Sequence, residues 1–405
     1  MKGYLHTGIK SECFGCEACA QVCARNAIQM QEDGEGFRYP MVDTSLCVEC
    51  GLCNLACPYE NMPQASGGEK LAFGGYHKAR EVKAQSTSGG AFSAIAESWC
   101  NENYVIFGAA AEGLQVYHTY VEDKAQLQPL RKSKYSQSRM GTAYRQVKAF
   151  LKEGKKVLFS GTPCQIAGLR AFLGNADTDK LLTVEVICEG VPTPHFVRGF
   201  EAYMKKRHGA EIQTLDYRYK DMKKTAGKWD FEVMYVLLKN GRRFKKDRWF
   251  NPFWSIWLSH LMSRPSCYQC PFATTSRLAD ISLGDLWGVH LYCPELYGRN
   301  GGASLIVCNT EKGRQALALA KPLLYGHELD FATALKYQSP MRGHIDGNPN
   351  REAFMADVRE MDYGELCKKW AKKPTAKLLW QKYIWGNRQK VFLWNLKNRN
   401  ATKTD

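Results

Sequence analysis

The sequence predicts an α+β protein in three parts: a small cysteine-rich domain over residues 1–64, a mixed α/β domain over 65–345, and a basic helical tail over 346–405. Three observations predict this division. Eight of the 16 cysteines lie in the first part, strand-like and helix-like segments alternate through the middle, and the end combines Lys and Arg with aromatic residues. A chain of 405 residues is long enough for two or three domains with a buried core.

The composition favours a globular protein of a reducing compartment. The hydrophobic share is 44% and the charged share is 24%, and no run of about 18 apolar residues could span a membrane. The opening residues MKGYLHTGIKSE lack the apolar core of a signal peptide, so we expect a cytoplasmic protein. In such a protein, 16 cysteines indicate metal or redox chemistry rather than disulfides.

The first domain repeats one cysteine spacing. CFGCEACAQVC and CVECGLCNLAC both follow C-x2-C-x2-C-x3-C, the run of bacterial two-cluster ferredoxins. Three cysteines in one tight loop bind three irons of a 4Fe–4S cubane, and the fourth reaches the other cubane. The predicted ligands are Cys13, Cys16, Cys19 and Cys57 for cluster one, and Cys47, Cys50, Cys53 and Cys23 for cluster two. Ala24 replaces the proline that usually follows the fourth cysteine, which changes the turn but no ligand.

The segments around the second run are less specific. QEDGEGFRYPMVD, residues 31–43, is expected to form a short hairpin between the two cysteine runs. PQASGGEKLAFGG, residues 63–75, is rich in Gly and Ser and is expected to connect the two domains. Zinc-binding cysteine pairs are the alternative for this domain, although zinc does not require the doubled run.

Hydrophobic periodicity organises the larger domain. Strands are predicted at 104–109, 156–160, 182–188 and 303–308, and helices at 90–101, 142–153, 163–174, 193–207 and 311–320. FEVMYVLLKNGRRFKK predicts a hairpin that turns at Asn240-Gly241. Strands that alternate with helices, followed by a hairpin, indicate a mixed α/β domain.

Two stretches of this domain could bind a ligand. STSGGAF places Gly89 and Gly90 after Ser88 at a helix start, where exposed N–H groups suit a phosphate or the edge of a flavin. A plain helix cap is the alternative. SKYSQS supplies a cation and a ring, Lys134 and Tyr135, which could equally be a solvated pair.

Two further stretches end predicted strands. DISLGDLWG ends its strand at Gly284 and Asp285. GTPCQIAGL follows its strand with Gly161 and Thr162, and then places Cys164 at the start of a helix. This cysteine could be a nucleophile whose pKa the helix dipole lowers, a metal ligand, or a small buried residue.

In this order, SxSGGAF, SKYxQS, GTPCQIAGL, ICxG, SCYxC and GDxWG resemble the coenzyme F420 hydrogenase/dehydrogenase beta-subunit family, in the form with an N-terminal two-cluster ferredoxin domain. The resemblance implies a flavoprotein that passes electrons between a two-electron carrier at FAD and iron–sulfur clusters. It allows coenzyme F420 as a ligand, and some bacterial relatives suggest a role in polysaccharide biosynthesis. The residues expected at FAD are Ser88, Gly89, Gly90, Lys134, Tyr135, Gly161, Thr162, Gly284 and Asp285.

Four cysteines outside the ferredoxin runs lie in these motifs, at strand ends and in a turn: Cys164, Cys188, Cys267 and Cys270. If the fold brings them together, they form a complete ligand set for a third 4Fe–4S cluster, and family members carry a cluster beside the flavin. Lys134 and the bases from Arg242 to Lys246 are candidates to balance its charge. A redox-active thiol or simple packing are the alternatives for Cys164.

The remaining candidates are weaker. We expect structural roles for the last four cysteines: Cys100, Cys293, Cys308 and Cys367. His195 follows ICEGVPTP near the expected third cluster and is the candidate proton donor. A histidine in such a place is more often an ordinary core or surface residue.

The net charge of +16 is concentrated at the C-terminus. Residues 1–62 carry eight acids against four bases, whereas residues 367–405 carry eleven Lys or Arg and one acid. The bases alternate with Trp380, Tyr383, Trp385, Phe392 and Trp394, which suits contact with an anionic membrane surface. The alternative is a helix that packs its aromatic side chains on the main domain. We expect no nucleic-acid partner, because charge alone is weak support for one.

These observations together predict an iron–sulfur flavoprotein oxidoreductase with a small-molecule substrate or deazaflavin, and ferredoxin or another redox protein as partner. The alternative is a non-enzymatic electron-transfer subunit of a larger redox complex. A third hypothesis is thiol–disulfide chemistry at Cys164 or at Cys267 and Cys270. The expected location is the cytoplasm, including its contact with the inner membrane face.

Overall fold

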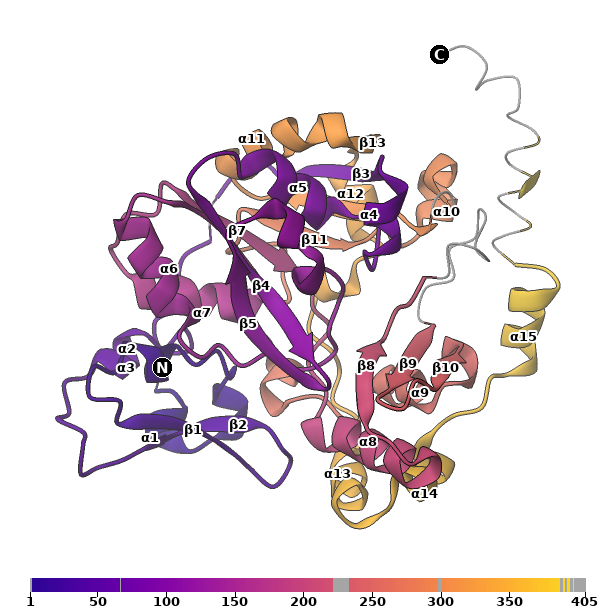
Figure 1. The fold of residues 1–405 in the computed structure, drawn as a ribbon, viewed down its shortest axis with the longest axis horizontal. Helices are drawn as coiled ribbons and strands as arrows, with labels where there is room; N and C mark the ends of the chain where they lie inside the picture. Colours follow the sequence, from indigo (N-terminus) through magenta and orange to yellow (C-terminus); the bar gives the residue numbers. More distant parts are fainter. Residues whose placement is uncertain are drawn as a thin grey trace.

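The computed structural model describes residues 2–65, 67–220, 233–297, 301–386, 389, 392, 393 and 396. Its centre is an eight-stranded sheet with the order β13-β3-β12-β11-β7-β6-β4-β5 (Figure 1). Four neighbouring strands run parallel: β11 (Ile281–Asp285), β7 (Leu181–Val186), β6 (Lys156–Gly161) and β4 (Tyr104–Glu112). Antiparallel strands flank them: β13 (Leu324–Leu329), β3 (Leu71–His77), β12 (Ser304–Cys308) and β5 (Gln115–Val121). The predicted mixed α/β domain is confirmed.

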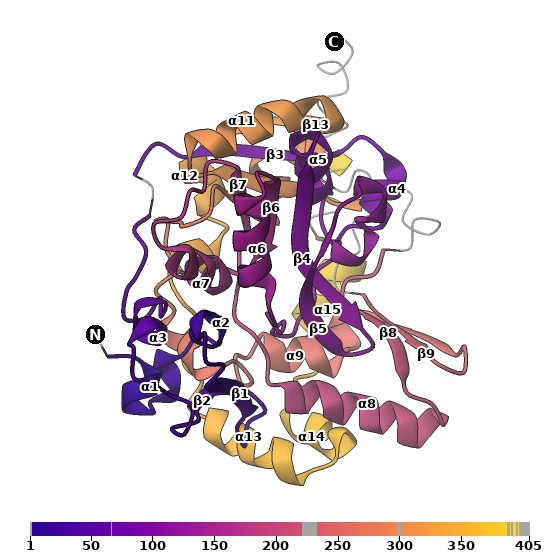
Figure 2. The same ribbon diagram turned by 60° about the vertical axis from the view of Figure 1, so that its left-hand side comes forward.

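Helices cover both faces of this sheet. α5 (Ala91–Trp99) packs with α11 (Glu311–Ala320) on one face, and α6 (Ala143–Lys152) packs with α7 (Pro163–Leu173) on the other (Figure 2). Along β6, Leu158 belongs to the core under α5, whereas Val157 and Phe159 belong to the core under α6 and α7. Such a strand is apolar at successive positions because both of its faces are buried.

The N-terminal domain contains the hairpin that the sequence predicted. β1 (Ile28–Glu32) pairs antiparallel with β2 (Arg38–Val42), and the short helices α1 (Tyr4–Thr7), α2 (Ala18–Val22) and α3 (Leu52–Leu55) surround it. Helix α2 contacts α6 and α7. Phe14, Ala18 and Ala56 join the same hydrophobic core as Phe159, so this domain is packed against the sheet layer rather than tethered to it.

A second, three-stranded antiparallel sheet contains β8 (Ile212–Asp216), β9 (Met234–Leu238) and β10 (Arg243–Lys246). The predicted turn at Asn240-Gly241 joins β9 to β10. Phe231 and Glu232, at the start of the predicted hairpin, lie outside the described residues. α8 (Pro194–His208) and α9 (Pro252–Trp257) contribute to the core beside this sheet. The remaining short helices in the main body are α4 (Arg80–Ala84), α10 (Val289–Tyr292) and α12 (Phe331–Leu335).

The C-terminal region is only partly a tail. α13 (Arg351–Glu360) and α14 (Tyr363–Trp370) pack on α8, and Phe354 and Leu366 are buried there (Figures 1 and 2). Assigning residues 351–370 to a tail was therefore wrong, because their apolar faces complete this core. α15 (Ala376–Tyr383) extends away from the body (Figure 1). Within the described part of the chain, no helix has the length and apolar character needed to cross a membrane.

The connector expected at residues 63–75 is also wrong in its second half. β3 begins at Leu71 and lies between β12 and β13 inside the sheet. Its two glycines resemble linker residues, but the sheet requires them. A Cβ atom on Gly75 would lie 2.5 Å from the carbonyl oxygen of Tyr325, so a larger residue would push β13 away.

Candidate functional site

A cavity of about 530 Å³ opens at the carboxyl ends of the parallel strands. Open α/β sheets usually bind ligands at this edge. Gly161 ends β6, Asp285 ends β11, and both line the cavity. Eight of the nine residues that the sequence assigned to a cofactor line it: Ser88, Gly90, Lys134, Tyr135, Gly161, Thr162, Gly284 and Asp285. The fold therefore brings the four separate motifs to one place.

Gly89, the ninth residue, serves packing instead. Its N–H donates to the Ser304 hydroxyl at 2.9 Å, and a Cβ atom at this position would lie 2.5 Å from the carbonyl oxygen of Gly75. Gly90 follows with φ of 90° and is the N-cap of α5, with no side-chain cap. Ala91 to Ser93 line the cavity, so the first turn of α5 presents its N–H groups there.

Lys134 stabilises the cavity wall. Its ammonium donates to the carbonyl oxygens of Ala109, Pro129 and Arg131 at 2.6, 2.8 and 2.7 Å. Burial lowers the pKa of Lys134 to about 7, and the nearby Lys132 lowers it further. All three ammonium hydrogens thus have backbone acceptors, which holds the 129–134 loop against β4.

Asp285 and Tyr135 are held by their neighbours. The Asp285 carboxylate accepts two hydrogen bonds from the Arg218 guanidinium, at 2.6 and 3.0 Å. The ring of Tyr135 meets those of Trp254 and Trp257 edge-on, with centroids 5.0 and 5.9 Å away. Trp254 also lines the cavity, and its buried indole N–H has no acceptor among the described residues. This donor is available to a ligand.

A second, smaller cavity of about 50 Å³ contains the four motif cysteines. Cys188 follows β7, and Cys267 and Cys270 lie in and after the 3₁₀ turn Pro265–Gln269. Cys164 stands in the first turn of α7, after the N-cap Thr162. All four line the small cavity: Cys164, Cys188, Cys267 and Cys270.

The two cavities share a wall, because the residues lining both include Gln137, Thr162, Cys188 and Glu189. A group bound among the four thiols would therefore stand next to a ligand in the large cavity.

Electrostatics support a common site for these thiols. Burial raises the pKa of Cys267 to about 12 and that of Cys270 to about 11, and the neighbouring Cys164 contributes to both increases. The pKa of Cys164 is also raised by burial, although the Thr162 hydroxyl opposes the increase. A helix N-terminus therefore does not make Cys164 an activated nucleophile, which favours the ligand interpretation of this residue.

The ferredoxin cysteines form the predicted first group. Burial raises the pKa of Cys16 well above its ordinary value, and Cys19, Cys57 and Cys13 raise it further. Charges act between thiols only at short range, so these four lie together. The pKa of Cys19 is raised by burial and then by Cys13 and Cys57, with a smaller contribution from Cys53. Since Cys53 belongs to the second group, it lies on the side of that group nearest the first.

The second group faces the surface. Cys50 and Cys47 raise the pKa of Cys53, after the larger effect of burial. Cys50 is exposed, and the thiol of Cys23 accepts a hydrogen bond from the N–H of Ala27 at 3.3 Å. Backbone N–H groups commonly stabilise cluster thiolates in this way.

Neither the ferredoxin thiols nor the Cys164 group has the spacing of a zinc site. Thiolates about 2.3 Å from a tetrahedral zinc ion would lie ~3.8 Å apart. Within the described residues, just one group of three or more His, Cys, Asp or Glu has its ligand atoms all within 4.8 Å of one another: Cys293, Glu295 and His327. The wider spacing of the ferredoxin and Cys164 groups suits a cubane and disfavours the zinc alternative.

Arg264 connects the first ferredoxin group to the Cys164 group, and sequence reasoning missed it. Its buried guanidinium donates to the carbonyl oxygen of Cys13 at 2.9 Å and to the side-chain oxygen of Gln137 at 3.1 Å. Gln137 in turn donates to the carbonyl oxygen of Phe14 at 2.8 Å. Both Arg264 and Gln137 line the small cavity. Arg264, rather than the bases on β10 or Lys134, is the cation beside the thiols.

His195, the expected proton donor, lies outside both sets of lining residues. It stands in the first turn of α8, and its Nδ1 is 3.1 Å from the Arg198 guanidinium. A Cβ atom on Gly36 would lie 3.1 Å from its ring, so His195 belongs to the contact between the β1–β2 loop and α8. This position gives it no access to a ligand in the large cavity.

Comparison with known families agrees with this arrangement. Residues 12–61 match the 4Fe-4S dicluster domain, and residues 154–325 match the C terminus of the coenzyme F420 hydrogenase/dehydrogenase beta subunit. The protein belongs to the coenzyme F420 hydrogenase/dehydrogenase beta-subunit family. The second match in this family member contains all four cysteines of the small cavity.

Individual relatives are more distant. One polypeptide of the anaerobic dimethyl sulfoxide reductase of Escherichia coli (strain K12) and its counterpart in Shigella flexneri are each 41% identical to this F420 beta-subunit-family protein over 49 residues, 12% of its length. The match spans 22% of the length of these curated relatives. A polypeptide of the F420-reducing [NiFe] hydrogenase complex from Methanosarcina barkeri is 15% identical, with a TM-score of 0.44, over 75% of the present protein and 94% of the hydrogenase polypeptide.

Proposed function

We propose that this protein is an iron–sulfur flavoprotein oxidoreductase that exchanges electrons between a hydride carrier in the large cavity and a redox protein at the ferredoxin domain. One observation carries the proposal. The large cavity adjoins the Cys164 group, Arg264 joins that group to the backbone of Cys13, and the second ferredoxin group ends at the exposed Cys50. The cysteine groups thus form a row from the cavity to the surface.

FAD is the proposed ligand of the large cavity. The first-turn N–H groups of α5 suit its pyrophosphate, and the free indole N–H of Trp254 suits an acceptor on a ring or ribose. When bound, a flavin supplies exchange between two-electron hydride donors and one-electron carriers. The aromatic group around Tyr135 gives the cavity an apolar side, which excludes water from a flat ring system.

Each cysteine group would hold one 4Fe–4S cluster. A complete set of four thiolates is the ligand count that a cubane requires, and clusters of this kind move single electrons. Arg264 places a buried positive charge between two groups and stabilises their negative charge. Gln137 fixes Arg264 from the cavity side.

The small-molecule partner is proposed to be a reduced deazaflavin of the coenzyme F420 type or another hydride donor. An intermediate of polysaccharide biosynthesis is the alternative substrate. Anaerobic assays with the isolated, flavin-loaded protein distinguish these from the non-enzymatic hypothesis. We expect F420H2 to reduce an added ferredoxin through this protein. If the isolated protein transfers no electrons from any hydride donor, the electron-transfer-subunit hypothesis replaces the proposed one.

The redox protein is proposed to dock at the second ferredoxin group. Large apolar side chains are exposed around Cys50: Met41, Val42, Leu46, Val48, Leu52 and Leu55. Exposed apolar residues gathered at one place indicate a protein contact. Residues 1–62 carry eight acids and four bases, so the matching partner surface is apolar at its centre and basic at its rim.

Charge at this surface tests the docking proposal. Leu55 is 64% exposed, and a Leu55→Glu variant should slow anaerobic electron transfer to a two-cluster bacterial ferredoxin by about tenfold, or ~1.4 kcal/mol. The matched control is Leu319→Glu, because Leu319 is 55% exposed on α11, at the far end of the molecule (Figure 1). Equal rates for both variants would place the docking surface elsewhere.

A further inference from the structure

A group of three possible metal ligands lies away from the cysteine sites described above. Cys293 follows α10, Glu295 lies in the next turn, and His327 lies on the edge strand β13. The Cys293 sulfur is 3.0 Å from Glu295 Oε1 and 3.3 Å from His327 Nε2, and the last two atoms are 2.7 Å apart. Two distant parts of the chain thus bring a sulfur, an oxygen and a nitrogen together.

The chemistry of these three atoms fits a zinc-class ion. Zinc accepts thiolate, carboxylate and imidazole ligands at about 2.0–2.3 Å, which places the ligand atoms of a tetrahedral site about 3.3–3.8 Å apart. The present separations are shorter, so each side chain would move outward by less than about 1 Å, a shift within the reach of side-chain rotation.

The second ring nitrogen of His327 supports metal binding. Nδ1 is 2.9 Å from the carbonyl oxygen of Glu328, and it donates its hydrogen there because a carbonyl can only accept. Nε2 then carries the lone pair and faces Cys293 and Glu295. Metal-binding histidines usually have this arrangement, in which a backbone acceptor fixes the tautomer.

Exposure leaves room for a fourth ligand. Cys293 is fully buried, whereas the Glu295 and His327 side chains are 32% and 50% exposed. An ion bound here would have its sulfur ligand on the protein side and an open position toward solvent. Three protein ligands with one open position is a common zinc arrangement.

We propose that Cys293, Glu295 and His327 bind one zinc-class divalent cation, with the Cys293 thiol releasing its proton on binding. The ion would fasten the turn after α10 to β13. Tyr292, which precedes Cys293, donates to the Trp287 carbonyl at 3.1 Å and stacks on Tyr337 at 5.3 Å. Trp287 and Tyr337 line the large cavity, so the ion would stabilise the segment behind that wall.

Zinc retention by the anaerobically purified, cluster-containing protein tests this site. The protein is incubated with zinc chloride, passed through a desalting column, and assayed for zinc and iron. We expect the wild type to retain about one zinc per chain that His327→Ala and Glu295→Gln both lose, with unchanged iron in all three. His208→Ala is the matched control, because His208 ends α8 outside the three-residue group, and it should retain the ion.

X-ray absorption at the zinc edge identifies the ligands. We expect one sulfur at about 2.3 Å and two or three nitrogen or oxygen atoms at about 2.0–2.2 Å. Retention of no zinc by the wild type, equal retention by the wild type and His327→Ala, or a shell of four sulfur atoms would each overturn the proposal. Glu295→Gln keeps the shape of the side chain, so the comparison survives if His327→Ala folds poorly.

Discussion

His118 shows how one buried residue links the fold to the cavity. Its Nε2 donates to the carbonyl oxygen of Ser160 at 2.9 Å, and its Nδ1 accepts from the Ser138 hydroxyl, 2.8 Å away. Ser138 belongs to the SKYSQS motif, so His118 ties that motif to the end of β6. Burial lowers the pKa of His118 to about 4, because a buried imidazolium would lose its hydration.

This pKa predicts a pH dependence of stability. Below pH 6.5 the unfolded chain protonates His118, whereas the folded chain stays neutral until about pH 4. Stability is therefore lost as the pH falls through this window, by about 3 kcal/mol for this group. His118→Gln keeps a donor and an acceptor and should remove that part of the pH dependence. Urea unfolding at pH 7, 5.5 and 4.5 measures it, and parallel curves for the two proteins would contradict the assignment.

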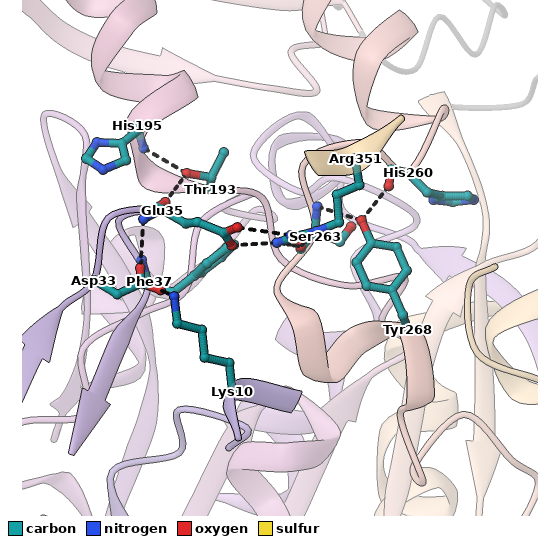
Figure 3. Close-up of polar contacts among 10 residues, drawn as sticks. All are labelled: Lys10, Asp33, Glu35, Phe37, Thr193, His195, His260, Ser263, Tyr268 and Arg351. Atoms are coloured by element: carbon teal, nitrogen blue, oxygen red, sulfur yellow. Dashed lines mark hydrogen bonds and ion pairs between the residues drawn. The ribbon is translucent and has the colours of Figure 1, made fainter. Parts of the chain in front are cut away.

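Among the elements, the β1–β2 loop of the ferredoxin domain is clamped by α13 (Figure 3). The Arg351 guanidinium donates to both Glu35 carboxylate oxygens, at 3.0 and 2.6 Å, and also to the carbonyl oxygen of Ser263 at 3.2 Å. Thr193, before α8, donates to the carbonyl oxygen of Glu35. Ser263 precedes the turn that carries Cys267, so one arginine holds the ferredoxin loop and the turn of the Cys164 group together.

A double-mutant cycle measures this clamp. Glu35→Gln and Arg351→Gln should show a coupling free energy of about 1.5–3 kcal/mol, because the pair is bidentate and mostly buried. Lys321 and Glu328 form a matched exposed pair at 2.7 Å, for which we expect less than about 1 kcal/mol. Anaerobic urea unfolding provides both values. Equal coupling in the two pairs would show that the Glu35–Arg351 contact is an ordinary surface ion pair.

At the scale of the whole molecule, the C-terminal region ends in an exposed aromatic segment. Trp380 and Trp385 are 57% and 50% exposed, and Phe392 is 62% exposed. Trp394 and the side chain of Tyr383 lie outside the described residues. Exposed aromatic side chains among bases suit the headgroup region of an anionic membrane, which we propose as their contact.

Vesicle co-sedimentation tests the membrane contact. The full chain should pellet with vesicles that contain phosphatidylglycerol, and binding should weaken as salt rises. A variant that ends after Pro374 keeps the packed helix α14 and should lose most of this binding. Equal pelleting of both proteins would remove the membrane hypothesis.

The sequence predicted much of this organisation, since spacing and periodicity are local properties. All four strands and five helices assigned by range are present, and the cysteine runs predicted which thiols of the first ferredoxin group lie together. β3 was missed because Gly74 and Gly75 lack strand character until β13 lies against them. Arg264 was missed because its partners are backbone atoms 226 or more residues away, and no local pattern marks such a contact.

Iron and acid-labile sulfide per chain, measured on anaerobically purified protein, test the central claim most directly. Three cubanes predict about 12 iron in the wild type and about 8 in Cys164→Ser, since each cubane holds four irons. Cys367→Ser is the control, because Cys367 lies in α14 beside Tyr363, and it should keep about 12. About 8 iron in all three proteins would contradict the account, since the Cys164 group would then hold no cluster.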